Sequence, residues 1–383
     1  MASLIGFTLF GLSFLQFSAD GAGSFIALDA ASVLYFLIYP RRLMRNSSTL
    51  VWFSWGLLCL ISTRIFMGVN EFPFLARVSL IFIDAFFLKE LFRPYNGMNQ
   101  EVMCSRALWL AAVAYALVFS LWLLTFDGVD SIFYFNNLKS WIATFPALFA
   151  VSQLTANRPK HSIFWALTAI SLSFFDSSTS RALLLQSVLL LLMALWQMNR
   201  RIAKLAILLV LIISLLSLSA LDAFVEKHDH SNTFRLIMIM QIVDFSWGEI
   251  IIGRGIDLWR LSAFNALYEM PGAENFFESA NPHFFPAEII IRGGIAFFVC
   301  ICGSFYVLFR RSQLVAVPAV MLFSTFFTTN TGVERLYMTL GIFVLISVLD
   351  TKKVGIFNPK SVEKNLFLSL DDVQSSGAKS LVV

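Results

Sequence analysis

His283 combines a reactive side chain with an informative position. It ends the polar segment Asn281-Pro282-His283, directly before an apolar run long enough to form a membrane helix. An imidazole has a pKa near neutrality, so it could act as a general base on an attacking hydroxyl group, a step worth roughly 10²–10⁴-fold in rate. A single histidine in a loop is more often a polar surface residue, and by position alone both interpretations stay open.

Four arginines lie in or near the polar segments that surround the later spans: Arg181, Arg235, Arg254 and Arg292. The guanidinium group is always charged and can donate two parallel hydrogen bonds, so arginines near an apolar interior suit phosphate recognition. Arg181 and Arg254 could alternatively be simple anchors at a membrane boundary. Arg292 lies deeper in its apolar segment, where an uncompensated charge costs roughly 2.5–3.5 kcal/mol, and Glu288 on the same helix face could neutralise it.

Metal chemistry has weaker support in the sequence. His228 and His230 have no cysteine or third histidine nearby, which is not the pattern of a metal site. The acidic residues of the same polar segment match no ligand loop; they are Asp257, Glu269, Glu274 and Glu278. We therefore expect neither a metal ion nor another cofactor.

The composition predicts the structural class of the protein that carries these residues. Hydrophobic residues make up 58% and charged residues 14% of the chain, and the mean hydropathy is +0.77. Apolar residues occur in continuous runs such as 182–196, whereas a membrane β-barrel would show strands of about ten residues with alternating character. The chain is therefore predicted to be an all-α, polytopic membrane protein. Its net charge of +4 does not indicate nucleic acid, because basic loops are usual in such proteins.

Hydropathy predicts about twelve transmembrane helices. They lie near 2–18, 24–39, 50–68, 73–90, 107–126, 140–155, 163–175, 182–198, 205–221, 284–309, 314–329 and 336–349. Lys and Arg cluster in alternate loops, so both termini are expected to be cytoplasmic in a bacterial inner membrane. The long loop 222–283 then faces outward, toward the periplasm in a Gram-negative cell.

One transmembrane domain is expected over 1–349, including the outer loop 222–283, with a cytoplasmic tail over 350–383. The tail is rich in Lys, Asp, Ser and Gly and cannot bury enough apolar surface to fold alone, so it is predicted to be disordered. Apolar residues recur at helical spacing over 234–243, which predicts a short helix on the membrane surface or over the bundle. The first apolar run lacks a charged start and is expected to be a retained span.

Several short motifs occur in a fixed order between residues 176 and 300. They are Ser180-Arg181 at the start of a span, Arg235 followed by Trp247, Gly253-Arg254-Gly255, and Pro282-His283 followed by Gly294. Their order resembles the O-antigen polymerase and O-antigen ligase family, which is similar also in having many spans and one long, late periplasmic loop. The earlier spans match the family only in hydropathy. Phe284 and Arg292 stand where the family often has an asparagine and an acidic residue.

The resemblance implies a metal-independent membrane glycosyltransferase. Its donor would be an oligosaccharide repeat unit on undecaprenyl pyrophosphate at the outer face of the inner membrane. Arg181 and Arg235 would bind the pyrophosphate, with Arg254 and Arg292 as further candidates, and His283 would activate the acceptor hydroxyl. Other expected partners are membrane lipids and a chain-length regulator and flippase of the same pathway, but no nucleic acid.

Three functions stay open. A polymerase would extend lipid-linked repeats into O-antigen or exopolysaccharide, and we favour it because of the departures at Phe284 and Arg292. A ligase would transfer finished polymer to the lipid A core. A flippase or polysaccharide transporter belongs to another class; its pathway could be lined by Asp29, Arg64, Asp84 and Arg292, although no repeated segment of the kind common in transporters is found.

Overall fold

The computed structural model describes residues 2–14, 27–44, 47–68, 71–93, 100–125, 142–175, 181–212, 240–267, 285–309 and 332–355. These ranges contain helices and no β-strand, which confirms the predicted all-α class for the described part of the chain. The helices are α1 (Ala2–Phe14), α2 (Ala27–Ile38), α3 (Pro40–Met44), α4 (Ser47–Met67), α5 (Phe72–Leu91), α6 (Gln100–Thr125), α8 (Thr144–Thr155), α9 (Pro159–Phe175), α10 (Arg181–Met198), η1 (Gln241–Asp244), α12 (Trp247–Ile252), α13 (Ile256–Leu267), α15 (Phe285–Phe309) and α17 (Gly332–Gly355). Residues 200–212 are also helical.

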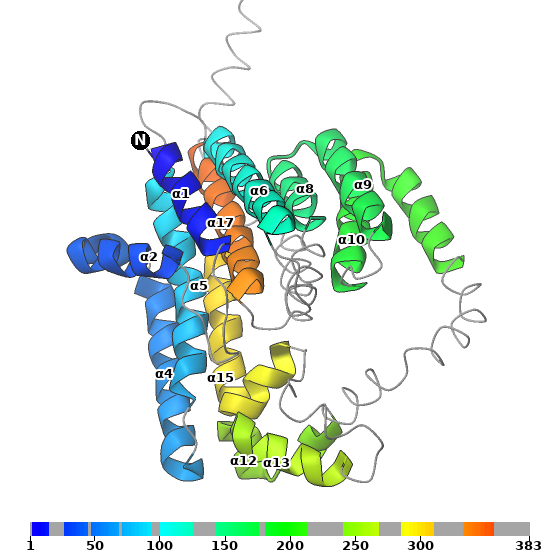
Figure 1. Cartoon of the computed structure of the whole chain (residues 1–383). Helices are drawn as coiled ribbons and strands as arrows, with labels where there is room; N and C mark the ends of the chain where they lie inside the picture. Colours follow the sequence, from blue (N-terminus) through cyan, green and yellow to red (C-terminus); the bar gives the residue numbers. More distant parts are fainter. Residues whose placement is uncertain are drawn as a thin grey trace, which may run out of the picture.

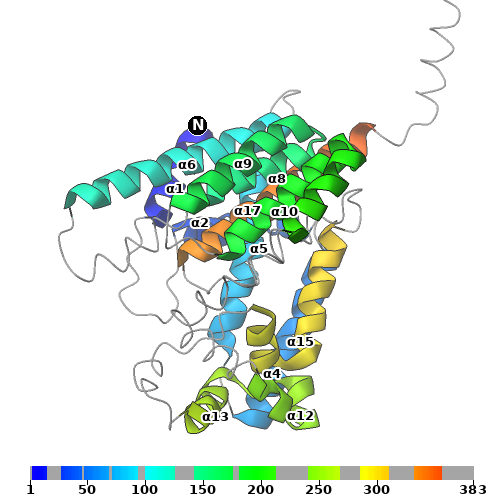
Figure 2. The same cartoon turned by 90° about the vertical axis from the view of Figure 1, so that its right-hand side faces the viewer.

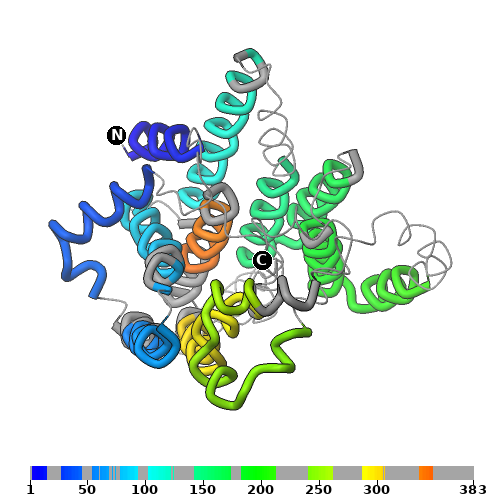
Figure 3. The backbone as a smooth tube through the Cα atoms, turned by 60° about the horizontal axis from the view of Figure 1, so that its bottom comes forward, coloured from blue at the N-terminus to red at the C-terminus, as the bar shows by residue number. Residues whose placement is uncertain are grey.

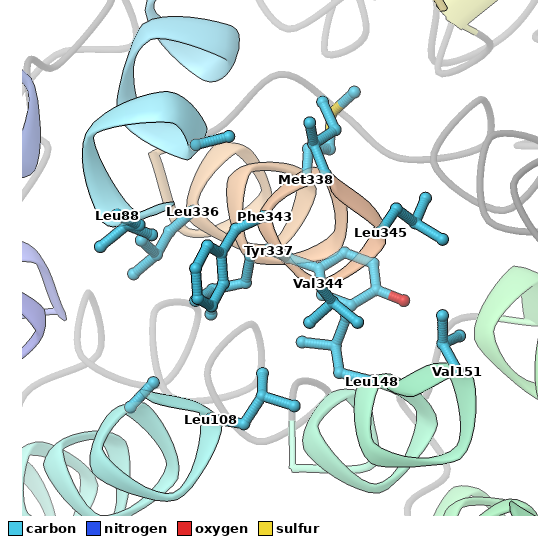
Figure 4. Packing of buried hydrophobic residues seen from close by; sticks show 14 of the residues in the cluster. Leu88, Leu108, Leu148, Val151, Leu336, Tyr337, Met338, Phe343, Val344 and Leu345 are labelled. Carbon is cyan, nitrogen blue, oxygen red and sulfur yellow. The ribbon is translucent and has the colours of Figure 1, made fainter. Parts of the chain in front are cut away.

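The larger of two helix groups is built around α17, drawn in orange in Figure 1. All residues from 336 to 347 are buried, and a mainly apolar helix of this kind is stable when neighbours cover every face. Those neighbours are α5, α6 and α8. Figure 4 shows Phe343 and Val344 of α17 packed among Leu88 of α5, Leu108 of α6 and Leu148 of α8. Outside this centre, α1 packs on α6, α2 on α5, and α9 on both α8 and α10.

The second group consists of α4 and α15, which lie side by side (Figures 1 and 3). Their close approach depends on Gly56 of α4, where a Cβ would lie only 3.0 Å from the ring of Phe297. Phe74 of α5 packs edge-on against the same ring, with 6.2 Å between the centroids, and so connects this group to α5. In Figure 2 the axes of α4 and α15 run across those of α6 and α9.

The described part of the predicted outer loop covers one end of α4 and α15. Figures 1 and 2 both place α12 and α13 at this end. α12 contacts α15 and α4, and α13 contacts α15. The sequence analysis did not predict these two helices. The short helix that it predicted over 234–243 lies mainly outside the described residues, and of that stretch the structure describes only 240–243.

The described helices coincide with most of the predicted spans, for example α5 with 73–90 and α10 with 182–198. Within the described ranges, two helical segments are long and apolar enough to cross a membrane: Val102–Leu121 in α6 and Ala287–Ser304 in α15. Other apolar helices, such as α1 and α2, are shorter. These segments support membrane association, whereas the number of spans and their sidedness stay predictions. The predicted span 314–329 lies outside the described residues, and α17 continues to Gly355, past the expected domain end at 349.

Candidate functional site

The site begins with α12, whose start is fixed by a capping box. The Ser246 hydroxyl accepts a hydrogen bond from the Glu249 backbone N–H (3.4 Å), and the Glu249 carboxylate accepts one from the Ser246 backbone N–H (2.8 Å). This reciprocal pair satisfies backbone donors that the first turn of a helix leaves open. α12 ends at Gly253, whose φ of 87° lies in the left-handed region that suits glycine.

Glu249 also holds the first candidate phosphate ligand, Arg254. The Arg254 Nε donates to Glu249 Oε1 at 2.6 Å and one terminal nitrogen donates to Oε2 at 3.0 Å, a two-pronged pair. The guanidinium group lies 4.4 Å from the centre of the Phe245 ring. Hydrogen bonding from Arg254 is the largest cause that lowers the pKa of Glu249 to about 2. Arg254 is therefore fixed in place, and its charge is compensated by Glu249.

The Gly253-Arg254-Gly255 turn docks on a kink in α15. Gly294 has φ 69° and ψ −175°, which interrupts the helix. The backbone N–H groups of Arg254 and Gly255 donate to the Ile291 carbonyl at 2.9 and 2.8 Å. A Cβ at Gly253 would lie 2.6 Å from the Arg292 carbonyl, and a Cβ at Gly294 would overlap the Ile251 carbonyl. Glycine is thus required on both sides, because the two backbones touch.

Arg292, the second described candidate ligand, lies beside this contact in a buried ion-pair cluster. Its terminal nitrogens lie 2.5 Å from Glu71 Oε2 and 2.9 Å from Glu288 Oε1, and its Nε donates to Glu288 Oε1 at 3.0 Å. Its guanidinium carbon lies 4.5 Å from the centre of the Phe74 ring. The side chains of Arg292, Glu71 and Glu288 are only 11%, 0% and 7% exposed. Neutralisation of Arg292 by Glu288, one of the alternatives from the sequence, is confirmed.

Glu71 connects three elements at this point. It is the N-cap residue of α5, but its side chain does not cap that helix. Instead Oε1 accepts a hydrogen bond from the backbone N–H of Ile256, the first residue of α13, at 2.7 Å, while Oε2 pairs with Arg292. A carboxylate is favourable at a helix N-terminus because the first N–H groups there carry partial positive charge. One buried side chain thus joins α5, α13 and α15.

The acidic groups of the site outnumber the basic groups by one. Two guanidinium groups, of Arg254 and Arg292, face three carboxylates, of Glu71, Glu249 and Glu288. Both arginines already donate to carboxylates, so a phosphate group would compete with these carboxylates for the guanidinium groups. Arg254 is the more accessible of the two arginines, because its side chain is 17% exposed and that of Arg292 is 11% exposed.

The structure brings together two of the five predicted site residues, Arg254 and Arg292. Arg181 is the first residue of α10, which belongs to the larger helix group and lies apart from α12 and α13 in Figures 1 and 2. His283 and Arg235 lie outside the described residues, although in the sequence only Phe284 separates His283 from α15. Asp257 is exposed on α13, 4.0 Å from Arg260.

The sequence analysis also considered residues for a metal site and for a transport pathway. Among the described residues, no group of His, Cys, Asp and Glu side chains could hold a metal ion. Asp29 and Asp84 are buried, and the Ser32 hydroxyl donates to Asp84 at 2.5 Å, whereas Arg64 is exposed and donates to the Gly68 carbonyl. Asp84 and Glu71 lie about 20 Å apart along α5, at 1.5 Å per residue. Of the charged residues expected along a transport pathway, Asp29 and Asp84 therefore lie close together through Ser32, whereas Arg292 lies with Glu71 farther along α5.

Sequence reasoning missed Glu71 and Glu249. Glu249 had a readable signal, since Ser246 and Glu249 have the spacing of a capping box. Glu71 had none, because its partners are 185 and 221 residues away along the chain.

Comparisons with protein-family models, with curated proteins and with solved structures found no match.

Proposed function

We propose that this protein is a membrane glycosyltransferase that polymerises undecaprenyl-pyrophosphate-linked oligosaccharide repeat units. The observation that carries the proposal is the contact between two motifs of the resemblance. Gly253-Arg254-Gly255 and Gly294 are well separated in the sequence. Nevertheless, the backbone N–H groups of Arg254 and Gly255 donate to the Ile291 carbonyl beside the kink at Gly294. This contact sets Arg254 beside Ile291 of the apolar helix that follows His283.

The reaction needs a base for the acceptor and a cationic group for the leaving group. His283 takes the proton of the acceptor hydroxyl while the hydroxyl oxygen attacks the anomeric carbon of the donor sugar. The bond between that carbon and the pyrophosphate oxygen breaks, and undecaprenyl pyrophosphate leaves with the electron pair. Fixed arginines stabilise the charge that develops on the leaving oxygen. No metal ion takes part in this scheme.

The four arginines contribute differently in this proposal. Arg254 offers a planar guanidinium group that can exchange Glu249 for a phosphate oxygen, and Arg181 and Arg235 complete the binding of the pyrophosphate. The described contacts of Arg292 with Glu71 and Glu288 favour a supporting role, in which it holds α15 against α5 and α13. Direct binding of substrate by Arg292 would require one of these buried pairs to open.

The proposed setting is the outer face of the bacterial inner membrane. About twelve spans, with both termini in the cytoplasm and the loop 222–283 outside, place Arg254 and His283 on the side where the lipid-linked repeats are joined in the resembled family. The apolar segments Val102–Leu121 and Ala287–Ser304 support a membrane location.

Deletion of the gene in the source bacterium distinguishes polymerase from ligase. A polymerase deletion leaves surface lipopolysaccharide with at most a single repeat, or removes a high-mass exopolysaccharide while the core stays intact. If deletion instead leaves bare core while full-length polymer accumulates on the lipid carrier, the protein is a ligase. Loss of polymer together with unpolymerised repeats retained on the cytoplasmic face would identify a flippase.

A further inference from the structure

α12 turns its apolar face outward and a charged side chain inward, which is the reverse of a surface helix in a water-soluble protein. Trp247 and Ile251 lie one above the other on the same helix face, and both are strongly exposed, Trp247 to 82%. Glu249 lies on the opposite face and points inward, where it pairs with Arg254. A helix at a protein–water boundary turns its polar face outward instead. The outward face of α12 is therefore built for an apolar environment.

The exposed apolar surface continues into neighbouring elements. Met240 and Val243, in and next to η1, are also exposed, the latter to 74%. At the other end of α12 the Thr63 hydroxyl of α4 bonds to the Ile252 carbonyl, and Ile65 and Phe66, which follow Arg64 on α4, are exposed as well. An apolar surface that extends over several elements marks an interaction surface rather than isolated exposed side chains.

The depth of α12 relative to α15 identifies the partner. α12 contacts α15 at Gly294, inside the candidate span Ala287–Ser304. At a rise of 1.5 Å per residue, Gly294 lies about 10 Å from the beginning of that span. Interfacial helices bury their apolar faces about 5–10 Å into the boundary between lipid headgroups and acyl chains, and Trp is enriched at this depth.

We infer that η1 and α12 lie in the boundary of the lipid bilayer, with Met240, Val243, Trp247 and Ile251 against the acyl chains. Hydrogen bonds from the Gly253-Arg254-Gly255 turn to Ile291 hold the segment at this depth. The inference does not depend on the catalytic proposal. If that proposal also holds, the opposite face of α12 presents Arg254 at the level of a lipid-linked phosphate.

Site-directed fluorescence in vesicles tests the inference. The full chain, with its four native cysteines replaced by alanine, receives one new cysteine at a time for an environment-sensitive dye. Trp247→Cys and Ile251→Cys report on the apolar face. Asp257→Cys is the matched control at an exposed acidic position of α13. Each protein is reconstituted in vesicles of phosphatidylethanolamine and phosphatidylglycerol, with and without nitroxide-labelled acyl chains.

The dye at positions 247 and 251 should emit at shorter wavelength than at 257, lose most of its intensity to the acyl-chain nitroxide, and resist quenching by iodide. The dye at 257 should respond in the opposite way. Iodide quenching at 247 and 251 equal to that at 257 would contradict the inference, because the face would then be in water. Protection from both quenchers would also contradict it, because protein, such as a second copy of the chain, would cover the face. Matching helical content by circular dichroism checks that each variant is folded.

Discussion

Glu71 links three parts of the chain through one buried carboxylate. Replacing it by alanine leaves Arg292 with one partner and the Ile256 N–H without an acceptor. Breaking a buried pair in this way should lower the free energy of unfolding by about 3–5 kcal/mol. Glu71→Gln should cost less, because the amide oxygen can still accept from Ile256. Denaturation of the purified protein in detergent measures both changes.

Asp257→Ala is the matched control for Glu71. Its 4.0 Å pair with Arg260 is exposed to solvent, and such pairs contribute about 0–1 kcal/mol. A loss at Glu71→Ala no larger than that at Asp257→Ala would contradict the structural role of the cluster.

The Glu249–Arg254 pair makes a separate prediction about pH. Because the folded protein lowers the pKa of Glu249 from 4.5 to about 2, the ionised carboxylate stabilises the fold. This contribution is fully present above pH 4.5 and is lost as the pH falls through about 2. The difference in melting temperature between the native protein and Glu249→Gln should therefore be constant above pH 4.5 and shrink below it. A difference that does not change between these pH values would show that the pair does not stabilise the fold.

How far the site could be predicted at the residue scale depended on sequence distance. Glu288 and Arg292 lie on one helical face, so their pairing could be anticipated from the spacing alone. The pairing of Arg292 with Glu71 could not, because it requires α5 and α15 to be neighbours, and no local pattern encodes that. The compensation of Arg254 by Glu249 is local in the sequence, so only that of Arg292 by Glu71 was hidden for this reason.

At the scale of elements, the kink at Gly294 is the contact that holds α12 on α15. Gly294→Ala should separate the two backbones, because a Cβ there would overlap the Ile251 carbonyl and the residue has a φ of 69°. We expect a destabilisation of at least about 1–3 kcal/mol, the usual cost of a strained backbone position, and loss of polymerising activity. Thermal unfolding and an activity assay on the same preparation measure the two effects.

Gly248→Ala provides the control within α12, since a Cβ at this position meets no atom within 4 Å. This substitution should leave activity intact and could stabilise the helix by up to about 1 kcal/mol. Equal behaviour of the two alanine variants would show that the α12–α15 contact is not required.

Helices that consist of an apolar run were predictable from the sequence, whereas the short helix α12 was not. α5, α10 and α15 each follow from a continuous apolar run, which is the strongest signal in a membrane protein. α12 contains only Trp247–Ile252 and depends on its capping box and its contact with α15, so hydropathy carries no signal for it. The position of α17 among α5, α6 and α8 was equally hidden, because an apolar helix does not specify which apolar neighbours it packs against.

At the scale of the whole molecule, the proposed topology can be tested directly. A reporter enzyme that is active only outside the cytoplasm should function when fused within 222–283 and fail when fused after Gly355, where α17 ends. A cytoplasmic reporter should show the opposite pattern. Activity of the first reporter only at the later fusion point would place His283 in the cytoplasm and exclude the proposed donor.

The most direct test of the central claim is polymerisation by the purified protein. Reconstituted in vesicles with undecaprenyl-pyrophosphate-linked repeat units and no metal ion, the native protein should produce a ladder of longer lipid-linked oligosaccharides. His283→Ala should slow this reaction by roughly 10²–10⁴-fold, the usual contribution of a general base. His161→Ala, at an exposed position on α9, should not slow it. A ladder that forms at the same rate with His283→Ala would remove the proposed base, and a folded native protein that produces no ladder would contradict the proposed function.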